Sequence, residues 1–465
     1  MNQCRGCNAL ILMLGTMLLS PTIHAGTTPH RQSVIVSVLG GVQIRQALAE
    51  DHARGKDISR EQRSALVEST SNGNKMWASA LAREMGINVE QVYGSAFVGF
   101  SANVTDAQMI ALQQDPDVES VSANFPMHVA AQGKPGGGGG GSPQVVPWGI
   151  TRVGAAGAAN RGTGIHVFVI DSGIDLDHPD LAANIIDGYA VQACKTAGGM
   201  ACHATWDDDY GHGSHVSGTI AAINNTIGVV GVAPEAMLHA VKVLDSRGGT
   251  DAAKVAAGMD YVTQRTLALG TATVANVSIG GNGSKVGYCD AAGYHGTDNY
   301  ARAFCAAANA GVIVAVSAGN FHVNARGFLP STYDDAVIAV SAAWGGPASP
   351  NGDWWWNDSN WGVEAAAWNP RPSAPVALGA PGYLVLSTVT VEKGSYAEYT
   401  GTSMAAPHVA GSIALYLKKY PQGNSYSAFT NMRQLLLNAS TSTNGFYNTS
   451  TYSHTENYLN VIPAR

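Results

Sequence analysis

The sequence predicts an α/β domain, a parallel sheet covered by helices on both faces, preceded by a small α+β domain. Runs of β-branched residues without polar alternation, such as 165–170 and 312–317, are typical of strands buried on both faces. Helical stretches lie between these runs, as parallel strands require. A glycine-rich segment at 133–143 divides the chain, because glycine loses the most backbone entropy on ordering. We interpret it as a linker.

Composition agrees with a folded protein that has a large core. Of the 465 residues, 45% are hydrophobic and 13% are charged, and the formal net charge is −7. This fraction of hydrophobic residues excludes a disordered chain. The mild acidic balance gives no reason to expect nucleic acid or an anionic membrane as a partner.

The N-terminus has the pattern of an export signal. Arg5 supplies the positive charge, residues 9–19 are apolar, and small residues precede Gly26. The apolar run is too short to span a membrane, which takes about 20 residues. We therefore expect residues 1–25 to be a signal peptide and the protein to be secreted and extracellular.

Four cysteines remain after removal of the signal. In an oxidising compartment an even number favours disulfides. Their proximity in sequence favours Cys194–Cys202 and Cys289–Cys305 among three possible connectivities. The alternative is a zinc site, for which the ligand spacing is poor.

The region before the linker predicts a ferredoxin-like fold. A strand is expected at 33–38, a helix at 59–85, a strand pair at 89–104 with a turn near 94–95, a helix through Leu112 capped by Thr105 and Asp106, and a strand at 118–129. The order β-α-β-β-α-β buries one sheet face under two helices.

The region after the linker predicts the parallel sheet. Its strands are expected at 165–170, 238–244, 273–279, 312–317 and 337–342, with a long helix at 252–269. In such folds the chemistry collects beyond the carboxyl ends of the strands.

Three motifs lie at such places. Asp171 ends the strand 165–170 and is followed by a Ser-Gly turn. His212 begins a helical stretch rich in small residues. Ser403 begins another, in Gly-Thr-Ser-Met-Ala-Ala-Pro, where proline is tolerated in the first turn. An aspartate, a histidine and a serine are the groups that acyl transfer needs.

Each group has a distinct chemical role. A serine hydroxyl is a poor nucleophile near neutrality, so His212 takes its proton and later gives it to the leaving amine, while Asp171 orients the imidazole. The side-chain amide of Asn320, just after the strand 312–317, and the Ser403 N–H are candidate oxyanion donors. A turn aspartate or a helix-capping histidine alone is a weak signal, but the motifs occur together. His215, His408 and Asp175 are given only packing roles.

These motifs, in this order, resemble the subtilase family of subtilisin-type serine endopeptidases. The order Asp, His, Ser is that of subtilisin. The resemblance covers nearly all of 144–465, and region 33–129 is similar to the family's inhibitory propeptide. It implies a signal peptide at 1–25, a propeptide at 26–132, a linker at 133–143 that contains or adjoins the maturation site, and a peptidase domain at 144–465.

The resemblance also implies how substrate binds. An extended peptide would lie between two backbone segments, Gly248, Gly249 and Thr250 on one side and Ser278, Ile279 and Gly280 on the other. The pocket for P1, the residue whose carbonyl is attacked, would be walled by Ser278–Gly280 and by Ser317, Ala318 and Gly319. Because these walls are small or apolar and Phe321 follows Asn320, we expect broad specificity with apolar or aromatic P1 residues.

Calcium is the cofactor that the resemblance implies. The loop 223–229 is similar to the family's calcium loop. The ligands would be the carbonyls of Ile223, Ile227 and Val229 and the side chains of Asn225, Gln144 and Asp180. Six oxygens suit a hard cation. The alternative is an ordinary polar loop.

Two segments depart from the family. Asp207–Asp209 precedes His212 and is a second metal site, a selector of basic substrate residues, or a solvated acidic turn, which is the default. A segment from 344 to 375 contains tryptophans at 344, 354, 355, 356, 361 and 368. It either forms a peptide- or carbohydrate-contacting surface or packs onto its own domain.

The sequence therefore predicts a secreted serine endopeptidase, monomeric, with protein substrates and its own propeptide as intramolecular inhibitor. Residues 124–130 are expected in the substrate cleft, with the maturation cut between about residues 129 and 142. The competing interpretations are an inactive binding homologue and an enzyme selective for basic residues.

Overall fold

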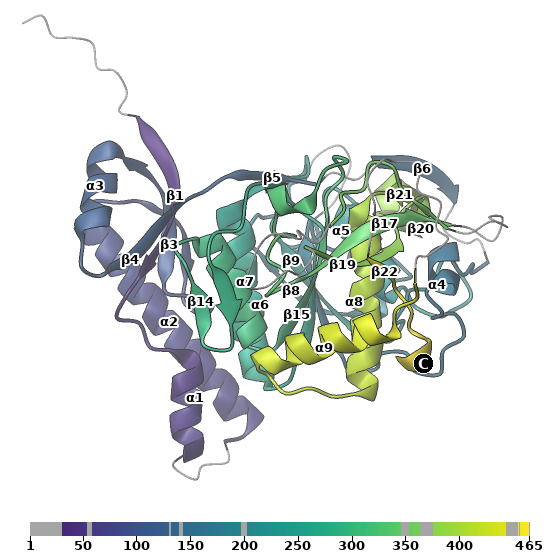
Figure 1. Cartoon of the computed structure of the whole chain (residues 1–465), viewed down its shortest axis with the longest axis horizontal. Helices are drawn as coiled ribbons and strands as arrows, with labels where there is room; N and C mark the ends of the chain where they lie inside the picture. The colour runs from purple at the N-terminus through teal and green to yellow at the C-terminus, as the bar shows by residue number, and fades with distance from the viewer. Residues whose placement is uncertain are drawn as a thin grey trace, which may run out of the picture.

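The computed structural model describes residues 30–53, 58–129, 132–138, 143–196, 202–345, 353–362, 375–442, 454 and 456–464. A small N-terminal domain lies at one end of the larger domain, with helix α2 (Arg60–Glu84) beside helix α6 (Ala252–Leu269) (Figure 1). The expected signal peptide lies outside the described residues, as do Trp368 and residues 130 and 131.

The N-terminal domain is an antiparallel sheet with three helices. Its strands run in the order β2-β3-β1-β4. The elements are β1 (Arg31–Val38), α1 (Ile44–Ala53), α2 (Arg60–Glu84), β2 (Val89–Tyr93), β3 (Gly99–Thr105), α3 (Asp106–Gln114) and β4 (Val118–Ala123). Apart from α1, which the sequence pattern did not reveal, this is the predicted β-α-β-β-α-β order.

The two faces of this sheet have different partners because successive side chains of a strand alternate. Val34 and Val36 pack with the domain's own helices, together with Leu81 of α2. Ile35, between them, belongs to the core of the larger domain. The second face is thus buried by the larger domain.

The larger domain is built on a nine-stranded sheet. The strand order is β22-β19-β17-β15-β11-β7-β9-β8, all parallel, with β18 pairing antiparallel to β17. The bounds are β7 (His166–Asp171), β8 (Ile185–Ala190), β9 (Met237–Lys242), β11 (Thr273–Val277), β15 (Val312–Ser317), β17 (Ile338–Trp344), β18 (Trp354–Trp355), β19 (Val376–Pro381) and β22 (Asn457–Tyr458). All five strands expected from β-branched runs are present, within about two residues at each end.

Helices cover the sheet. They are α4 (Trp148–Arg152), α5 (His212–Ala221), α6 (Ala252–Leu269), α7 (Asn299–Asn309), α8 (Thr402–Lys419) and α9 (Tyr426–Ala439). Helix α5 packs beside α8, and α6 packs beside α7. The expected parallel sheet with helices on both faces is confirmed.

Short strands complete the fold. They are β5 (Pro126–His128), β6 (Gln132–Gly138), β10 (Gly249–Asp251), β12 (Gly281–Asn282), β13 (Tyr288–Asp290), β14 (Gly293–His295), β16 (Phe328–Leu329), β20 (Val385–Thr388) and β21 (Tyr396–Thr400). Short 3₁₀ turns lie at 182–184, 325–327, 391–393 and 462–464. Both disulfides, Cys194–Cys202 and Cys289–Cys305, are present in the structure.

Candidate active site

The three motif residues meet at the carboxyl edge of the sheet. Asp171 is the last residue of β7, His212 the first of α5, and Ser403 the second of α8. His212 Nδ1 lies 2.8 and 2.9 Å from the two carboxylate oxygens of Asp171. All three residues are at most 1% exposed. This contact fixes the imidazole with Nε2 directed away from the aspartate.

The serine is held beside the predicted substrate strand. Its Oγ donates to the Ser278 carbonyl at 3.2 Å, and the Ser278 hydroxyl donates to the Ser403 carbonyl at 2.9 Å. His212 Nε2 is buried without a hydrogen-bond partner among the described residues. The serine–histidine bond is therefore not formed in this state, as is common before a reacting complex tightens.

Asn320 is oriented by the residue before the serine. Its Oδ1 accepts from the Thr402 N–H at 2.9 Å and from the Thr402 hydroxyl at 2.7 Å, and this hydroxyl accepts from the Gly319 N–H at 3.0 Å. The Ser403 N–H lies in the first turn of α8, where N–H groups have no partner within the helix. The carboxamide and the helix terminus are thus tied together.

A second asparagine, missed from the sequence, supports the same loop. Asn360 Oδ1 accepts from the Phe321 N–H at 3.0 Å and from the Val323 N–H at 3.1 Å, and its Nδ2 donates to the Ala318 carbonyl at 2.9 Å. Asn360 is fully buried and belongs to the tryptophan-rich segment. That segment therefore braces the Asn320 loop.

The described tryptophans favour the packing interpretation of this segment. Trp355, Trp356 and Trp361 are at most 8% exposed. Trp355 stacks on His454 with ring centroids 4.1 Å apart. Trp344 is 44% exposed, so one ring still faces solvent.

Asp207–Asp209 is not a solvated turn, which corrects the default expectation. The three residues are only 3 to 4% exposed. The Asp209 carboxylate pairs with Lys242, which is itself fully buried beside the end of β7. Protein donors therefore already satisfy these carboxylates, which argues against both the metal-site and the basic-selector interpretations.

Asp208 joins the strand and helix that carry the catalytic pair. One carboxylate oxygen accepts from the Ser172 hydroxyl at 2.7 Å and from the N–H groups of Tyr210 and Gly211 at 2.9 and 2.7 Å. The other accepts from the Ser214 N–H at 2.9 Å and from its hydroxyl at 2.6 Å. Because Gly211 offers no side-chain cap to α5, Asp208 supplies the acceptors there.

The histidines assigned to packing are buried. His215 Nε2 lies 2.9 Å from the Val385 carbonyl, and burial lowers the pKa of His215 to about 3. Burial also lowers the pKa of His408 to about 4. Both rings are therefore neutral near pH 7.

The cleft holds the end of the N-terminal domain. Strand β5 pairs antiparallel with β10, with His128 opposite Gly249. On its other side the His128 N–H donates to the Gly280 carbonyl at 3.1 Å, and the Gly280 N–H donates to the His128 carbonyl at 3.3 Å. The Val129 N–H donates to the Gly248 carbonyl at 3.2 Å. The two predicted segments thus sandwich an extended chain, and the side chain of Met127 is fully buried.

The chain pairs again on the far side of the serine. Strand β6 runs antiparallel to β21, with Gln132 opposite Thr400, three residues before Ser403. Residues 126–129 and 132–138 therefore bind to successive parts of the cleft.

The N-terminal domain is also fixed to helices α6 and α7. The Asp260 carboxylate, on α6, accepts from the N–H groups of Ser95 and Ala96 at 2.6 and 2.7 Å, and Lys75 Nζ lies 3.4 Å away. Burial raises the pKa of this carboxyl. Asn124 accepts from the Ala253 N–H at 2.9 Å.

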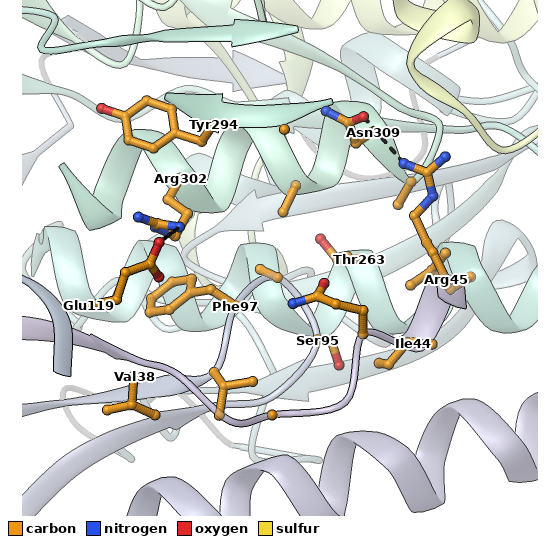
Figure 2. Close-up of a pocket in the computed structure, with 18 of the residues that line it drawn as sticks. Val38, Ile44, Arg45, Ser95, Phe97, Glu119, Thr263, Tyr294, Arg302 and Asn309 are labelled. Atoms are coloured by element: carbon orange, nitrogen blue, oxygen red, sulfur yellow. Dashed lines mark hydrogen bonds and ion pairs between the residues drawn. The ribbon is translucent and has the colours of Figure 1, made fainter. Parts of the chain in front are cut away.

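A cavity of about 470 Å³ lies along this interface (Figure 2). Arg302 pairs with Glu119 at 2.9 Å, and Arg45 donates to Asn309 at 3.2 Å. Neither the three motif residues nor Asn320 lines this cavity.

The predicted calcium ligands come together. Gln144 Nε2 donates to the carbonyls of Ile223 and Val229 at 2.8 and 3.1 Å, and lies 3.3 Å from Asn225 Oδ1. Asn225 Nδ2 donates to Asp180 at 2.7 Å. Ile227 lies on the same loop, where its N–H donates to Asn225. Within the described residues, no group of three or more His, Cys, Asp or Glu is suited to a metal; this set has a single carboxylate.

The fold and this geometry define a serine hydrolase of the Asp-His-Ser type. Comparison with known proteins gives the family. Residues 162–455 match the profile of the subtilase family, and residues 47–130 match that of the peptidase inhibitor I9 family. The chain therefore belongs to the subtilase family and is a subtilisin-like serine protease with an inhibitor I9 propeptide domain.

Individual proteins similar to this chain agree with the family assignment. Subtilisin E of Bacillus subtilis is 33% identical over 333 residues, which are 70% of this chain and 72% of that protein. An extracellular serine proteinase of a Thermus species is 32% identical over 344 residues, 72% of this chain and 70% of the other. The crystal structure of a cold adapted subtilisin-like serine proteinase aligns with a TM-score of 0.51 and 27% identity, covering 68% of this chain and 98% of that one.

Proposed function

We propose that this chain is the precursor of a secreted serine endopeptidase that cleaves protein substrates through an acyl-enzyme on Ser403. The observation that carries the proposal is the strand β5, held as a substrate would be beside an Asp171–His212 pair. Backbone pairing on both sides gives affinity without demanding a sequence, which suits broad specificity.

The groups have distinct roles in the proposed reaction. Ser403 Oγ attacks the peptide carbonyl carbon while His212 Nε2 takes its proton, and Asp171 stabilises the imidazolium. The Asn320 amide and the Ser403 N–H donate to the oxyanion. The C–N bond breaks as His212 protonates the amine. A water molecule, deprotonated by His212, then attacks the acyl carbon. The ester bond to Ser403 Oγ breaks, His212 returns the proton to Oγ, and the carboxylic acid leaves.

We propose that the first peptide cut is the chain's own. His128 is paired to Gly280, and Gln132 is paired to Thr400, so the bond at the serine lies between these anchors. Val129 is also anchored, because its N–H donates to the Gly248 carbonyl, and of the three bonds between Val129 and Gln132 the middle one is Ala130–Ala131. This proposal narrows the range in which the cut is expected, which was about 129 to 142. A cut at this bond leaves the whole linker, residues 133–143, attached to the peptidase domain.

The cut propeptide would then remain as an inhibitor. The contacts at β10, at Asp260 and along the sheet face do not depend on the peptide bond at residues 130–131. We propose that inhibition ends when the N-terminal domain is degraded, since its unfolding removes all these contacts at once.

Calcium is proposed at the 223–229 loop. The amide of Gln144 lies among the oxygens of Ile223, Asn225 and Val229, where a cation would be attracted. Turning the Gln144 amide over adds its oxygen to the set. Chelation is expected to lower the melting temperature of the Ser403→Ala protein, and re-added Ca²⁺, but not Mg²⁺, to restore it. An unchanged melting temperature would contradict the site.

Secretion, a monomeric state and a preference for apolar P1 residues complete the proposal. Secretion is supported by the N-terminal pattern and by two disulfides, which persist in oxidising compartments. No helix in the described ranges has the length and apolar character needed to cross a membrane.

Casein hydrolysis by the secreted protein tests the function. We expect activity that a serine-reactive inhibitor abolishes and that Ser403→Ala lacks. N-terminal sequencing of the mature form is expected to begin at Ala131. A folded, processed protein without hydrolysis of any protein substrate would support the inactive-homologue alternative.

A further inference from the structure

Phe328 lies where the predicted P1 pocket should be. The pocket is bounded by two backbone segments, 278–280 and 317–319, both rich in small residues. A Cβ added at Gly280 would lie 2.1 Å from Phe328 Cε1, and one added at Gly319 would lie 2.9 Å from the same carbon. One edge of a single ring therefore touches both walls.

The position of this ring is fixed. Phe328 begins β16, which pairs with β12 directly after the 278–280 segment. Its carbonyl accepts from the Ser331 hydroxyl at 2.8 Å. The ring is 3% exposed, and its centroid lies 5.5 Å from that of Phe321, which is 55% exposed at the surface. Phe328 thus belongs to the buried wall.

We infer that Phe328 fills the deep part of the P1 pocket and limits P1 to small apolar side chains, alanine above all. A substrate phenyl ring would have to displace a buried phenyl ring that already contacts both walls. This inference rests on the proposed peptidase function and narrows its apolar preference to small residues, against the aromatic part of the expectation from the sequence.

The chain's own junction agrees with a shallow pocket. Residues Val129, Ala130 and Ala131 are the only ones that a cut between Val129 and Gln132 can place at P1. Each is small or of moderate size. The first substrate of the enzyme therefore fits the pocket that Phe328 leaves.

The test compares two chromogenic tetrapeptide anilides that differ only in Ala or Phe at P1, cleaved by the self-processed secreted enzyme. We expect kcat/KM to favour Ala by about tenfold or more, because steric exclusion of a ring outweighs its hydrophobic gain. Phe328→Ala is expected to reverse this order. Phe321→Ala, which removes an exposed ring nearby, is the matched control and is expected to keep it.

The outcomes separate the inference from the proposed function. Wild-type enzyme that prefers Phe at P1, or a folded Phe328→Ala variant that still prefers Ala, overturns the inference while leaving the peptidase intact. Cleavage of neither peptide, or cleavage that survives Ser403→Ala, overturns the proposed function. If Phe328→Ala does not fold, Phe328→Leu and the wild-type P1 profile still decide.

Discussion

Asp208 offers the sharpest test of how the catalytic pair is positioned. Its carboxylate accepts five hydrogen bonds, from Ser172, Tyr210, Gly211 and twice from Ser214. Ser172 adjoins Asp171, and Gly211 adjoins His212. Asp208→Asn keeps the shape of the side chain but retains only one acceptor oxygen.

The expected loss of stability follows from the number of hydrogen bonds that the variant can no longer accept. If the remaining oxygen faces Ser172 and Gly211, the buried Ser214 N–H is left without an acceptor, because the Ser214 hydroxyl can turn but the N–H cannot. A hydrogen bond to a charged group contributes about 1.5–3 kcal/mol. We expect the free energy of unfolding to fall by about that amount. We also expect kcat to fall at least about tenfold, as the start of α5 shifts relative to Asp171.

KM is expected to change little, because the proposed substrate contacts are backbone groups of β10 and Gly280, and Asp208 makes no hydrogen bond to these groups. Steady-state kinetics on the P1 alanine peptide separates the two constants. Thermal unfolding is measured in the Ser403→Ala background, which prevents self-digestion.

Asp177→Asn is the matched control, since it removes the same charge from a side chain that is 57% exposed. A folded Asp208→Asn enzyme with wild-type kcat would refute the positioning role. Equal losses in both variants would show a general effect of charge instead.

Three further predictions concern other parts of the site. Asn320→Ala is expected to lower kcat by roughly 10²–10³, the cost of removing one oxyanion donor in subtilisin, with KM little changed; a loss below tenfold in steady-state kinetics would exclude Asn320 as a donor. Ser403→Ala is expected to accumulate as the uncut precursor, and its normal processing in a protease-free system, seen by mass spectrometry, would exclude self-cleavage. Burial raises the pKa of Asp175 to about 7, so the folded state loses stability as pH rises from about 4 to about 7, where only the unfolded chain ionises freely. Asp175→Asn is therefore expected to stabilise the protein at about pH 8, relative to about pH 4, by at most about 4 kcal/mol in thermal unfolding; an equal effect at both pH values would contradict the burial of a neutral carboxyl.

The elements that could be predicted are those specified by local signals. Helix α6 spans 252–269 as expected, since Asp251 caps its first turn and Gly270 ends it with a φ of 73°. Strands buried on both faces carry a continuous apolar run, which the sequence displays directly. The catalytic motifs were found because each combines a reacting residue with small neighbours.

What could not be predicted depends on contacts distant in sequence. Helix α1 has little pattern of its own, and its Ile44 and Leu48 are buried against Leu267 of the larger domain. The burial of Asp208 depends on backbone donors that assemble only in the fold. Phe328 and Asn360 lie in loops, and no local pattern indicates which wall or carbonyl a loop residue will reach.

The two strands on either side of the serine are held very differently, and under the proposed function this difference explains how one cleft would cut its propeptide and then keep it bound. Strand β5 is paired on both sides and is continuous with a domain whose sheet face is buried in the peptidase core. Among the residues that the structure describes, strand β6 pairs only with β21, and its sequence from 132 to 138 contains four glycines and a proline. Glycine loses much entropy on ordering, and proline donates no hydrogen bond. After cleavage, strand β6 is therefore expected to leave the cleft first. Its departure lowers the effective concentration of the new N-terminus beside the new C-terminus, which makes religation unfavourable while the N-terminal domain stays bound.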